Sequence, residues 1–241
     1  VDVASLAPAD LLNLRGGRIG MIFQDPMMTL NPVLRIDTQM METIVAHNKN
    51  VSKVEAHQRS RDALGQVGIP APDERLRAYP HQFSGGMRQR VAIAIALLNK
   101  PDLIIADEPT TALDVTIQGQ ILSETQKLCH KFGTAMIWIT HDLAVVAGLA
   151  DKICVMYAGR IVEQGLINDV LDRPIHPYTR GLLGSVPGHN TRGKRLFQIP
   201  GMTPSLLKLP QGCAFQARCS NAEAARLAIV KSAEAAQLAV L

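Results

Sequence analysis

The stretch PDLIIADEPTTALD, residues 101–114, constrains the fold of this chain more than any other part of its sequence. Residues 103–106 form an apolar run without alternation, which is typical of a strand buried on both faces of a parallel sheet. Asp107 and Glu108 follow at once, and Pro109 then ends the strand. Ligand sites of open α/β sheets lie at the carboxyl ends of their strands, so the two acids predict a site for Mg²⁺ and an attacking water. The alternative is that they only cap the next helix.

Two further predicted strands end in a polar side chain. RIGMIF, residues 18–23, is typical of a strand and leads into Gln24, a position from which a ligand could be reached. AMIWIT, residues 135–140, predicts another buried strand, and His141 follows it in the same layer as the acidic pair. An ordinary turn at Gln24 and a capping histidine at His141 are the competing interpretations. No other His or Cys has metal-ligand spacing to His141, which argues against a zinc site.

Upstream of the acidic strand, HQFSGGMRQRVAIAIALLNKPD, residues 81–102, predicts a helix that begins as an anion site. Ser84 is a good N-cap, and Gly85 and Gly86 let backbone amides approach a ligand closely. Residues 87–98 are apolar nearly all round after the first turn, which is typical of a buried helix. The free amides and the dipole at the start of such a helix favour phosphate. A helix cap that happens to contain glycines is the alternative.

The rest of the chain alternates predicted helices and strands around these motifs. Residues 52–67 predict a helix with a capping box of Ser52 and Glu55. Asp114 can cap a long helix over residues 115–132. The further predicted elements are a helix over 143–150 capped by Asp142, a hairpin of strands 152–157 and 160–164, a short helix capped by Asn168, a short helix in HPYTRGLL from His176, and a C-terminal helix over 222–241.

Composition argues against several classes of protein. The 241 residues carry a net charge of +4 and only 4% aromatic residues, so neither a nucleic-acid surface nor a base-stacking platform is expected. No stretch approaches the ~20 apolar residues of a membrane span, and no secretory signal opens the chain. Cys129 and Cys154 lie in apolar patterns and are expected in the core, with the thiols reduced in a cytosolic protein.

Four motifs in a fixed order resemble those of ATP-binding cassette (ABC) ATPases. FSGGMRQR, residues 83–90, resembles the family signature, and LIIADEPTTALD resembles the Walker B strand, its glutamate and the D-loop. Gln24 matches the Q-loop and His141 the switch histidine, so the resemblance covers about residues 10–170. More narrowly, MIFQDPMMTLNP, and HPYTRGLL followed by GKRLFQIPG, look like the ATPases of oligopeptide/dipeptide and nickel importers.

The resemblance implies a role for each residue at a strand end. Gln24 would contact the nucleotide's Mg²⁺ and sense the transmembrane partner, and Asp107 would bind the Mg²⁺. Glu108 would polarise the attacking water, and His141 would contact the γ-phosphate. ATP and Mg²⁺ are therefore the expected cofactors.

The same resemblance implies a site shared between two subunits. Ser84, Gly85 and Gly86 would bind the γ-phosphate of ATP held by the opposite ATPase subunit, and Asp114 would lie at the dimer seam. The expected partners are a second ABC ATPase subunit, in a homo- or heterodimer, and transmembrane permease subunits. An extracytoplasmic solute-binding protein would act indirectly, and no nucleic-acid partner is expected. The chain would lie peripherally at the cytoplasmic face of the inner membrane.

The implied fold class is α/β, a P-loop NTPase-like ABC ATPase core. It would contain an incomplete parallel sheet with helices on both faces, a helical insertion and a small C-terminal extension. Residues 1–25 would be the remnant of the N-terminal core, and residues 26–80 the helical subdomain. Residues 81–170 would form the core with the signature, Walker B, D-loop and switch histidine, and residues 171–241 the extension of the oligopeptide-transporter type.

The Walker A loop of the family, GxxxxGK[ST], does not precede Gln24 in this sequence. That loop supplies the amides and the lysine that cradle the β- and γ-phosphates. We therefore expect an N-terminally truncated member that binds ATP weakly or not at all by itself. Residues 188–195 match GxxxxGK, but Arg195 stands where a Ser or Thr would ligate Mg²⁺, and no apolar strand precedes them.

The C-terminal extension departs from the family pattern as well. Cys213 and Cys219 resemble the start of a cysteine cluster of some relatives, but Arg226 occupies the next expected cysteine position. An iron–sulfur cluster normally needs four thiolates, so none is expected here.

The sequence thus predicts an ATP-binding and ATP-hydrolysing subunit of an importer of di-/oligopeptides or a related solute. A non-catalytic interaction subunit that lends its signature to a partner ATPase is one alternative. A soluble ABC ATPase of nucleic-acid repair or translation is the other, and the segments MIFQDPMMTLNP and HPYTRGLL argue against it.

Overall fold

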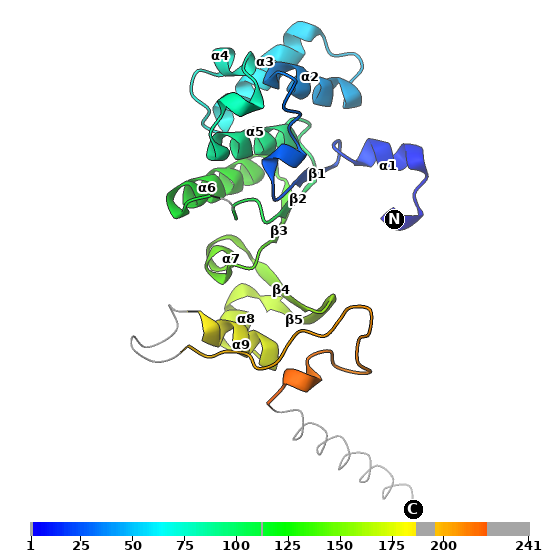
Figure 1. The fold of residues 1–241 in the computed structure, drawn as a ribbon. Helices are drawn as coiled ribbons and strands as arrows, with labels where there is room; N and C mark the ends of the chain where they lie inside the picture. Colours follow the sequence, from blue (N-terminus) through cyan, green and yellow to red (C-terminus); the bar gives the residue numbers. More distant parts are fainter. Residues whose placement is uncertain (1, 112, 187–195, 221–241) are drawn as a thin grey trace, which may run out of the picture. The chain divides into compact units, whose positions relative to one another are not determined.

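The structure, a computed structural model, describes residues 2–111, 113–186 and 196–220. Its contacts divide the chain into a first unit, Val1–Asp142, and a second unit, Leu143–Leu241 (Figure 1). The helix predicted over 222–241 and the GxxxxGK match at 188–195 lie outside the described residues. The domain limits given above rest on the family pattern and stay predictions.

The first unit interleaves helices with three strands (Figure 1). In chain order its elements are η1 (Val3–Ser5), α1 (Pro8–Leu14), β1 (Ile19–Ile22), η2 (Pro26–Met28), α2 (Ile36–His47), α3 (Lys53–Gln66), α4 (Pro72–Leu76), η3 (Pro80–Gln82), α5 (Gly85–Leu97), β2 (Leu103–Asp107), α6 (Val115–Phe132) and β3 (Ala135–Ile139). Three of these helices, α2, α3 and α4, fall in the region 26–80 that the sequence predicts to be helical. α5 lies between this group and α6.

The strands β1, β2 and β3 form one parallel sheet in that order. Ile22 pairs with Ala106, and Ala106 pairs with Trp138. Asp107 pairs with Ile139, so β2 and β3 end side by side. A parallel sheet with helices between its strands is the α/β fold that the sequence predicts, and this prediction is confirmed.

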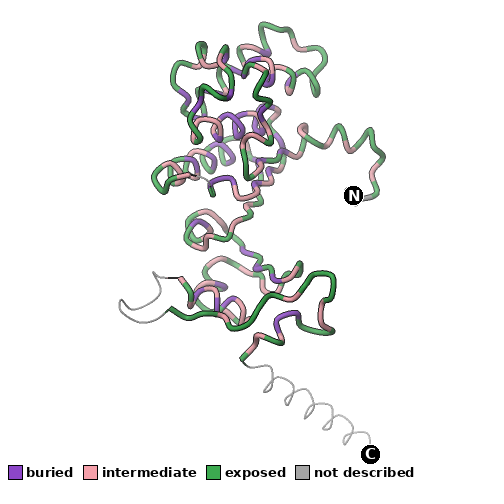
Figure 2. The backbone as a smooth tube through the Cα atoms, in the orientation of Figure 1, coloured by how far each residue is buried: buried purple, intermediate pink, exposed green. Residues whose placement is uncertain are grey.

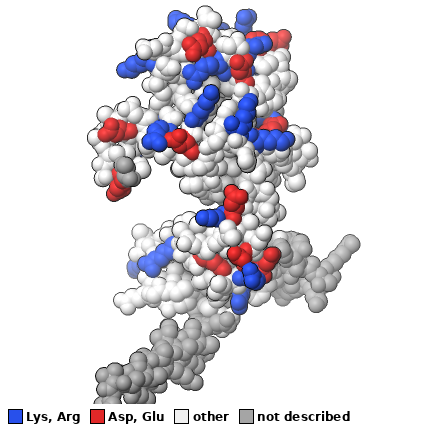
Figure 3. Space-filling view, turned by 180° about the vertical axis from the view of Figure 1, so that it is seen from behind, with Lys and Arg blue, Asp and Glu red and all other residues white. Residues whose placement is uncertain are grey.

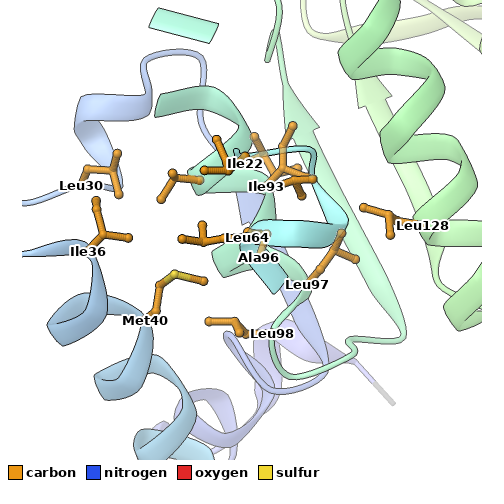
Figure 4. Packing of buried hydrophobic residues seen from close by; sticks show 14 of the residues in the cluster. Ile22, Leu30, Ile36, Met40, Leu64, Ile93, Ala96, Leu97, Leu98 and Leu128 are labelled. Carbon is orange, nitrogen blue, oxygen red and sulfur yellow. The ribbon is translucent and has the colours of Figure 1, made fainter. Parts of the chain in front are cut away.

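The core of the first unit lies on one face of this sheet. Ile22, Ile104 and Ala106 are buried there in one cluster with apolar side chains of α5 and α6 (Figure 4). Met40 of α2 and Leu64 of α3 join the same cluster at 0% exposure. Fully burying an aliphatic side chain contributes about 1.5–3 kcal/mol, so this face holds the sheet and the helical region together.

The opposite face of the sheet is largely open in the first unit. In the tube of Figure 2 the strands accordingly carry less buried residues beside buried ones. On the open face Met21, Ile137 and Ile139 are 42%, 50% and 46% exposed. The prediction that the strands are buried on both faces is therefore wrong for the described residues, because β2 and β3 alternate between a more buried and a less buried side. Successive right-handed crossovers between neighbouring strands place α5 and α6 on the same face, which leaves the other face uncovered.

The second unit is built on an antiparallel hairpin. Its elements are α7 (Leu143–Leu149), β4 (Lys152–Tyr157), β5 (Arg160–Leu166), α8 (Ile167–Asp172), α9 (Pro177–Ser185) and η5 (Gln216–Arg218). The predicted hairpin is confirmed, but two predictions in this unit are wrong. α8 is capped at Leu166 and already contains Asn168. Cys154 is exposed because alternate residues of β4 face away from the cluster formed by Ile153, Val155 and Val170.

Charged side chains tie the irregular parts of the second unit to the hairpin. The Glu163 carboxylate accepts from the N–H groups of Ile175 (2.7 Å) and His176 (3.0 Å) just before α9. Burial raises the pKa of this carboxyl, but the donors outweigh it and the pKa lies below its ordinary value. Arg218 donates to the carbonyl oxygens of Pro200 (2.7 Å) and Ile199 (3.3 Å), which fixes this segment beside η5.

Candidate functional site

Glu108 follows β2 in a backbone conformation that few residues other than glycine adopt. Its φ is 44°, in the left-handed region, and its N–H donates to the carbonyl oxygen of Ile139 at 2.9 Å. The next residues, Pro109 and Thr110, are buried, and Gln118 of α6 donates to the Thr110 hydroxyl at 3.1 Å. A left-handed bend costs on the order of 1–3 kcal/mol, and such bends cluster at functional sites, so this one marks a candidate site.

Four side chains meet at the bend, and we call them the carboxylate cluster: Gln24, Glu108, Thr111 and His141. Gln24 donates from Nε2 to Oε2 of Glu108 at 3.2 Å, and the Thr111 hydroxyl donates to the same oxygen at 3.0 Å. Nδ1 of His141 lies 2.9 Å from Oε1 of Glu108. The structure thus brings together three residues that the sequence predicts at three separate strand ends.

The electrostatics of the carboxylate cluster follow from this geometry. The hydrogen bond from His141 lowers the pKa of the Glu108 carboxyl, and the Thr111 hydroxyl acts in the same direction. The Glu108 carboxylate in turn raises the pKa of the His141 imidazole. The His141 side chain is 70% exposed and that of Glu108 is 26% exposed, so solvent screens the pair and it adds little to stability. The pair instead supplies one charge-assisted hydrogen bond to an ionised carboxylate.

Asp107 is the last residue of β2 and is half-buried. A carboxylate oxygen is a ligand that Mg²⁺ prefers, and so is the amide oxygen of Gln24, whose nitrogen is turned toward Glu108. The described ranges contain no group of three or more His, Cys, Asp or Glu side chains that could hold a metal ion. This residue set therefore fits Mg²⁺ held by one or two protein oxygens together with phosphate and water, and does not fit an all-protein metal cage.

The start of α5, which we call the α5 tip, consists of Ser84, Gly85 and Gly86. Ser84 Oγ accepts from the N–H of Met87 at 3.3 Å, which confirms the predicted N-cap. A Cβ added to Gly86 would lie 2.9 Å from Cγ2 of Ile117, so glycine at this position lets α5 pack closely on α6. The first N–H groups of a helix have no partner within it, and the helix dipole favours an anion at them.

Asp114 begins α6. Its Oδ1 accepts from the N–H of Ile117 at 3.0 Å, and α6 ends at Gly133 with a left-handed φ of 66°. Both ends of this helix are therefore as the sequence predicts. The place of Asp114 at a dimer seam concerns a second subunit and stays a prediction.

The sequence reasoning missed Thr111. The signal was its position three residues after a predicted catalytic acid, in a turn from Glu108 to Thr111 whose second residue is Pro109. The structure also keeps the two predicted halves of the site apart. In the part of the chain that it describes, no hydrogen bond or ion pair joins the α5 tip to the carboxylate cluster.

The surface charges are mixed. On the face drawn in Figure 3, Lys and Arg side chains lie among Asp and Glu side chains over much of the first unit. Among the residues that the structure describes, the charges of both signs are interspersed on this face. Within the same residues, no helix is both long and apolar enough to cross a lipid bilayer.

The chain matches two protein-family models. Residues 4–111 match the model described as ABC transporter. Residues 162–225 match the model described as oligopeptide/dipeptide transporter, C-terminal region. The first match includes Gln24, the signature and the acidic pair, and the second includes HPYTRGLL, whereas His141 lies between the two matches.

The chain is also similar to curated proteins and to a solved structure. It is 52% identical over 221 residues to the oligopeptide transport ATP-binding protein OppD of Escherichia coli (strain K12), covering 92% of this chain and 65% of that protein. It is 48% identical over 221 residues to the oligopeptide transport ATP-binding protein AppD of Bacillus subtilis (strain 168), covering 92% of this chain and 67% of that protein. The dimeric post-hydrolysis structure of the ATP-binding cassette MJ0796 bound to ADP and Pi matches with a TM-score of 0.60 and 29% identity over 68% of each chain. The chain thus spans about two thirds of the length of the curated relatives.

Proposed function

The chain belongs to the ATP-binding subunits of ABC transporters of the oligopeptide/dipeptide type, and from this premise we propose that it helps to hydrolyse ATP to energise solute import. The observation that carries the proposal is the carboxylate cluster. One ionised carboxylate at the end of a central strand is held from both of its oxygens by side chains of distant segments. Such an oriented carboxylate is suited to polarise a water for attack on a phosphate.

In this proposal three residues of the carboxylate cluster, Glu108, His141 and Gln24, each have one task. Glu108 orients and polarises the attacking water. His141, whose pKa is raised by the Glu108 carboxylate, is available as a cation or donor toward the γ-phosphate. Asp107, with Gln24, would hold Mg²⁺, which when bound neutralises phosphate charge.

The α5 tip serves a second nucleotide in the same proposal. Ser84, Gly85 and Gly86 would contact the γ-phosphate of ATP held by a partner ATPase, with Asp114 at the seam. The backbone amides at the start of a buried helix support this role. The similarity to a dimeric cassette structure supports a two-subunit arrangement.

The sequence of these 241 residues contains no GxxxxGK[ST], the loop that would supply the phosphate cradle. The 241-residue chain by itself should therefore bind ATP weakly or not at all. No iron–sulfur cluster is proposed either, since Arg226 stands at the next expected cysteine position and four thiolates would normally be needed. Calorimetric titration of the chain with ATP and Mg²⁺ tests the first point, and micromolar binding would contradict it.

The proposed partners follow the family pattern. The chain would act peripherally at the cytoplasmic face of the inner membrane, docked on permease subunits and served indirectly by an extracytoplasmic solute-binding protein. Oligopeptides, dipeptides or a related solute would be the cargo. The names of the two curated relatives contain the words oligopeptide transport, and the description of the second family model contains oligopeptide/dipeptide.

The proposal is tested by Glu108→Gln in the transporter assembled with its partner subunits. Losing a general base costs about 10²–10⁴-fold in rate, so we expect ATP hydrolysis to fall by at least about 100-fold. The matched control is Glu74→Gln on α4, an exposed glutamate outside the carboxylate cluster, which should leave the rate unchanged.

A second candidate function is a non-catalytic subunit that lends its α5 tip to a partner's ATP. The capped start of α5 supports it, because its backbone amides need no phosphate cradle in the same chain. This candidate predicts that Glu108→Gln leaves the ATPase rate of the assembled transporter unchanged. A larger side chain at Gly85 or Gly86, which would keep a phosphate away from the backbone amides, should lower that rate.

A further inference from the structure

Thr111 is the member of the carboxylate cluster to which the proposed function gives no task. Its hydroxyl donates to Oε2 of Glu108 at 3.0 Å, and its N–H donates to the carbonyl oxygen of Glu108 at 3.3 Å. Both bonds lie within a single turn, across a sequence separation of 3. Gln24 and His141 reach the same carboxylate from separations of 84 and 33. Thr111 is thus the local partner, whereas Gln24 and His141 reach the carboxylate from the ends of two other strands.

The turn that carries Thr111 is itself anchored. Thr110 is buried and accepts from Gln118 of α6 at 3.1 Å, and its carbonyl oxygen accepts from the N–H of Leu113 at 3.1 Å. On the other side, the N–H of Glu108 is bonded to Ile139 of β3 at 2.9 Å. The backbone of the turn is therefore held between β3 and the start of α6. A hydroxyl fixed to such a turn can hold a neighbouring carboxylate in one orientation.

We propose that Thr111 is a positioning residue for Glu108, whose hydroxyl fixes the carboxylate through Oε2 whether or not Gln24 and His141 are in place. The inference rests on the proposed function only for its catalytic consequence. The geometric part concerns the chain alone: with Oε2 held, Oε1 is directed to the side where His141 lies. A catalytic group that is already oriented lowers the entropic part of the activation barrier, so a less ordered carboxylate lowers the rate of the chemical step.

Two substitutions separate the hydroxyl from the rest of the side chain. Thr111→Val keeps the branched shape and removes the donor, whereas Thr111→Ser keeps the donor and removes a methyl group. Thr111 is exposed, so neither change opens a cavity in the core. Thr116→Val is the matched control, because Thr116 is an exposed threonine in the first turn of α6 and lies outside the carboxylate cluster.

The first test uses the full chain without nucleotide. Three-bond NMR couplings at the Cβ of Glu108 report whether its side chain occupies one rotamer. We expect a single rotamer in the wild type, in Thr111→Ser and in Thr116→Val, and averaging among rotamers in Thr111→Val. Couplings in Thr111→Val equal to those of the wild type would overturn the proposal.

The second test uses the assembled transporter. Losing a hydrogen bond to a charged group corresponds to about ten-fold in rate, so Thr111→Val should lower kcat by about ten-fold with KM for ATP unchanged. Thr111→Ser should stay within about two-fold of the wild type, which a merely structural role of the methyl group would not give. An unchanged kcat in Thr111→Val, or equal losses in Val and Ser, would contradict the proposal.

The two tests also distinguish this proposal from the proposed function. If Glu108→Gln leaves hydrolysis unchanged, the catalytic role of Glu108 fails, and the NMR couplings alone decide whether Thr111 positions the carboxylate. If Glu108→Gln abolishes hydrolysis, kcat and the couplings of the Thr111 variants must change together.

Discussion

The carboxylate cluster and the α5 tip are built in opposite ways. The carboxylate cluster consists of side chains that already bind one another, from sequence separations of 84 and 33. The α5 tip is made by one local cap, in which Ser84 accepts from Met87, and its function would depend on backbone amides. The cluster therefore needs the tertiary fold to exist, whereas the tip needs only a well-started helix.

In the proposed shared ATP site, the two regions would contribute in different ways. A set of preorganised side chains suits a region where charge develops during reaction. A row of backbone amides suits the binding of a phosphate that arrives from outside. Changes that affect one region and spare the other are the way to test the distinction.

The largest loss of stability is expected in the core on which both the carboxylate cluster and the α5 tip depend. Ile104 of β2 is 0% exposed and lies in one cluster with buried side chains of α5. Ile104→Ala should destabilise the chain by about 2–5 kcal/mol through lost burial and a residual cavity. Urea unfolding should show this loss of stability. The control is Ile137→Ala on the open face of the sheet, which should lose much less stability. Equal losses of stability would mean that Ile137 is buried in solution.

A smaller effect is expected at Gly86, and it should be confined to the α5 tip. Gly86→Ala forces a Cβ to 2.9 Å from Cγ2 of Ile117, a stiff β-branched side chain. We expect a destabilisation of about 1–2 kcal/mol after the gain in helix propensity. Gly85→Ala is the control, because its Cβ would lie 3.9 Å from Leu113, an ordinary contact. Thermal unfolding compares the two, and a Gly86→Ala variant as stable as Gly85→Ala would refute the close packing of α5 on α6.

The N-cap should have a similar but slightly smaller effect. Ser84→Ala removes the acceptor for the N–H of Met87 and should cost about 1 kcal/mol, whereas Ser84→Asp should retain most of the stability. The NMR signals of His141 should not change in either variant. A shift of those signals would show that the α5 tip and the carboxylate cluster are coupled in the free chain.

The smallest effect concerns protonation in the carboxylate cluster. The Glu108 carboxylate raises the pKa of His141 above its ordinary value of 6.5, and His141 lowers that of Glu108 below 4.5. The histidine's stabilising contribution is complete below its unfolded-state pKa and is lost as the pH rises through the raised pKa. The stabilising contribution of Glu108 is present above its unfolded-state pKa and is lost as the pH falls through its lowered pKa. The ion pair is therefore strongest at a pH between the lowered pKa of Glu108 and the raised pKa of His141.

An NMR titration of the imidazole measures this effect. Glu108→Gln should return the pKa of His141 toward its ordinary value, while Glu74→Gln should leave it raised. A His141 pKa that does not respond to Glu108→Gln would show that the contact at 2.9 Å is not formed in solution.

Local chemistry explains why much of this structure was predictable. The caps at Ser84 and Asp114 depend on residues within one turn, and a sequence displays them directly. The meeting of Gln24, Glu108 and His141 was predictable because parallel strands bring their carboxyl ends to one edge.

The misses concern features that depend on neighbours. The hydrogen bond from Thr111 forms because Glu108 adopts a left-handed backbone conformation, and a glutamate in a sequence does not predict that conformation. The open face of the sheet and the exposure of Cys154 depend on which elements cover a strand, and an apolar run does not carry that information.

The most direct test of the account is a structure of the assembled transporter carrying Glu108→Gln, with ATP and Mg²⁺ bound. The account predicts one nucleotide whose γ-phosphate lies within hydrogen-bond distance, about 3 Å, of His141, and a second whose γ-phosphate contacts the Ser84 hydroxyl and the Gly86 N–H. Nucleotides that contact neither the carboxylate cluster nor the α5 tip would contradict it.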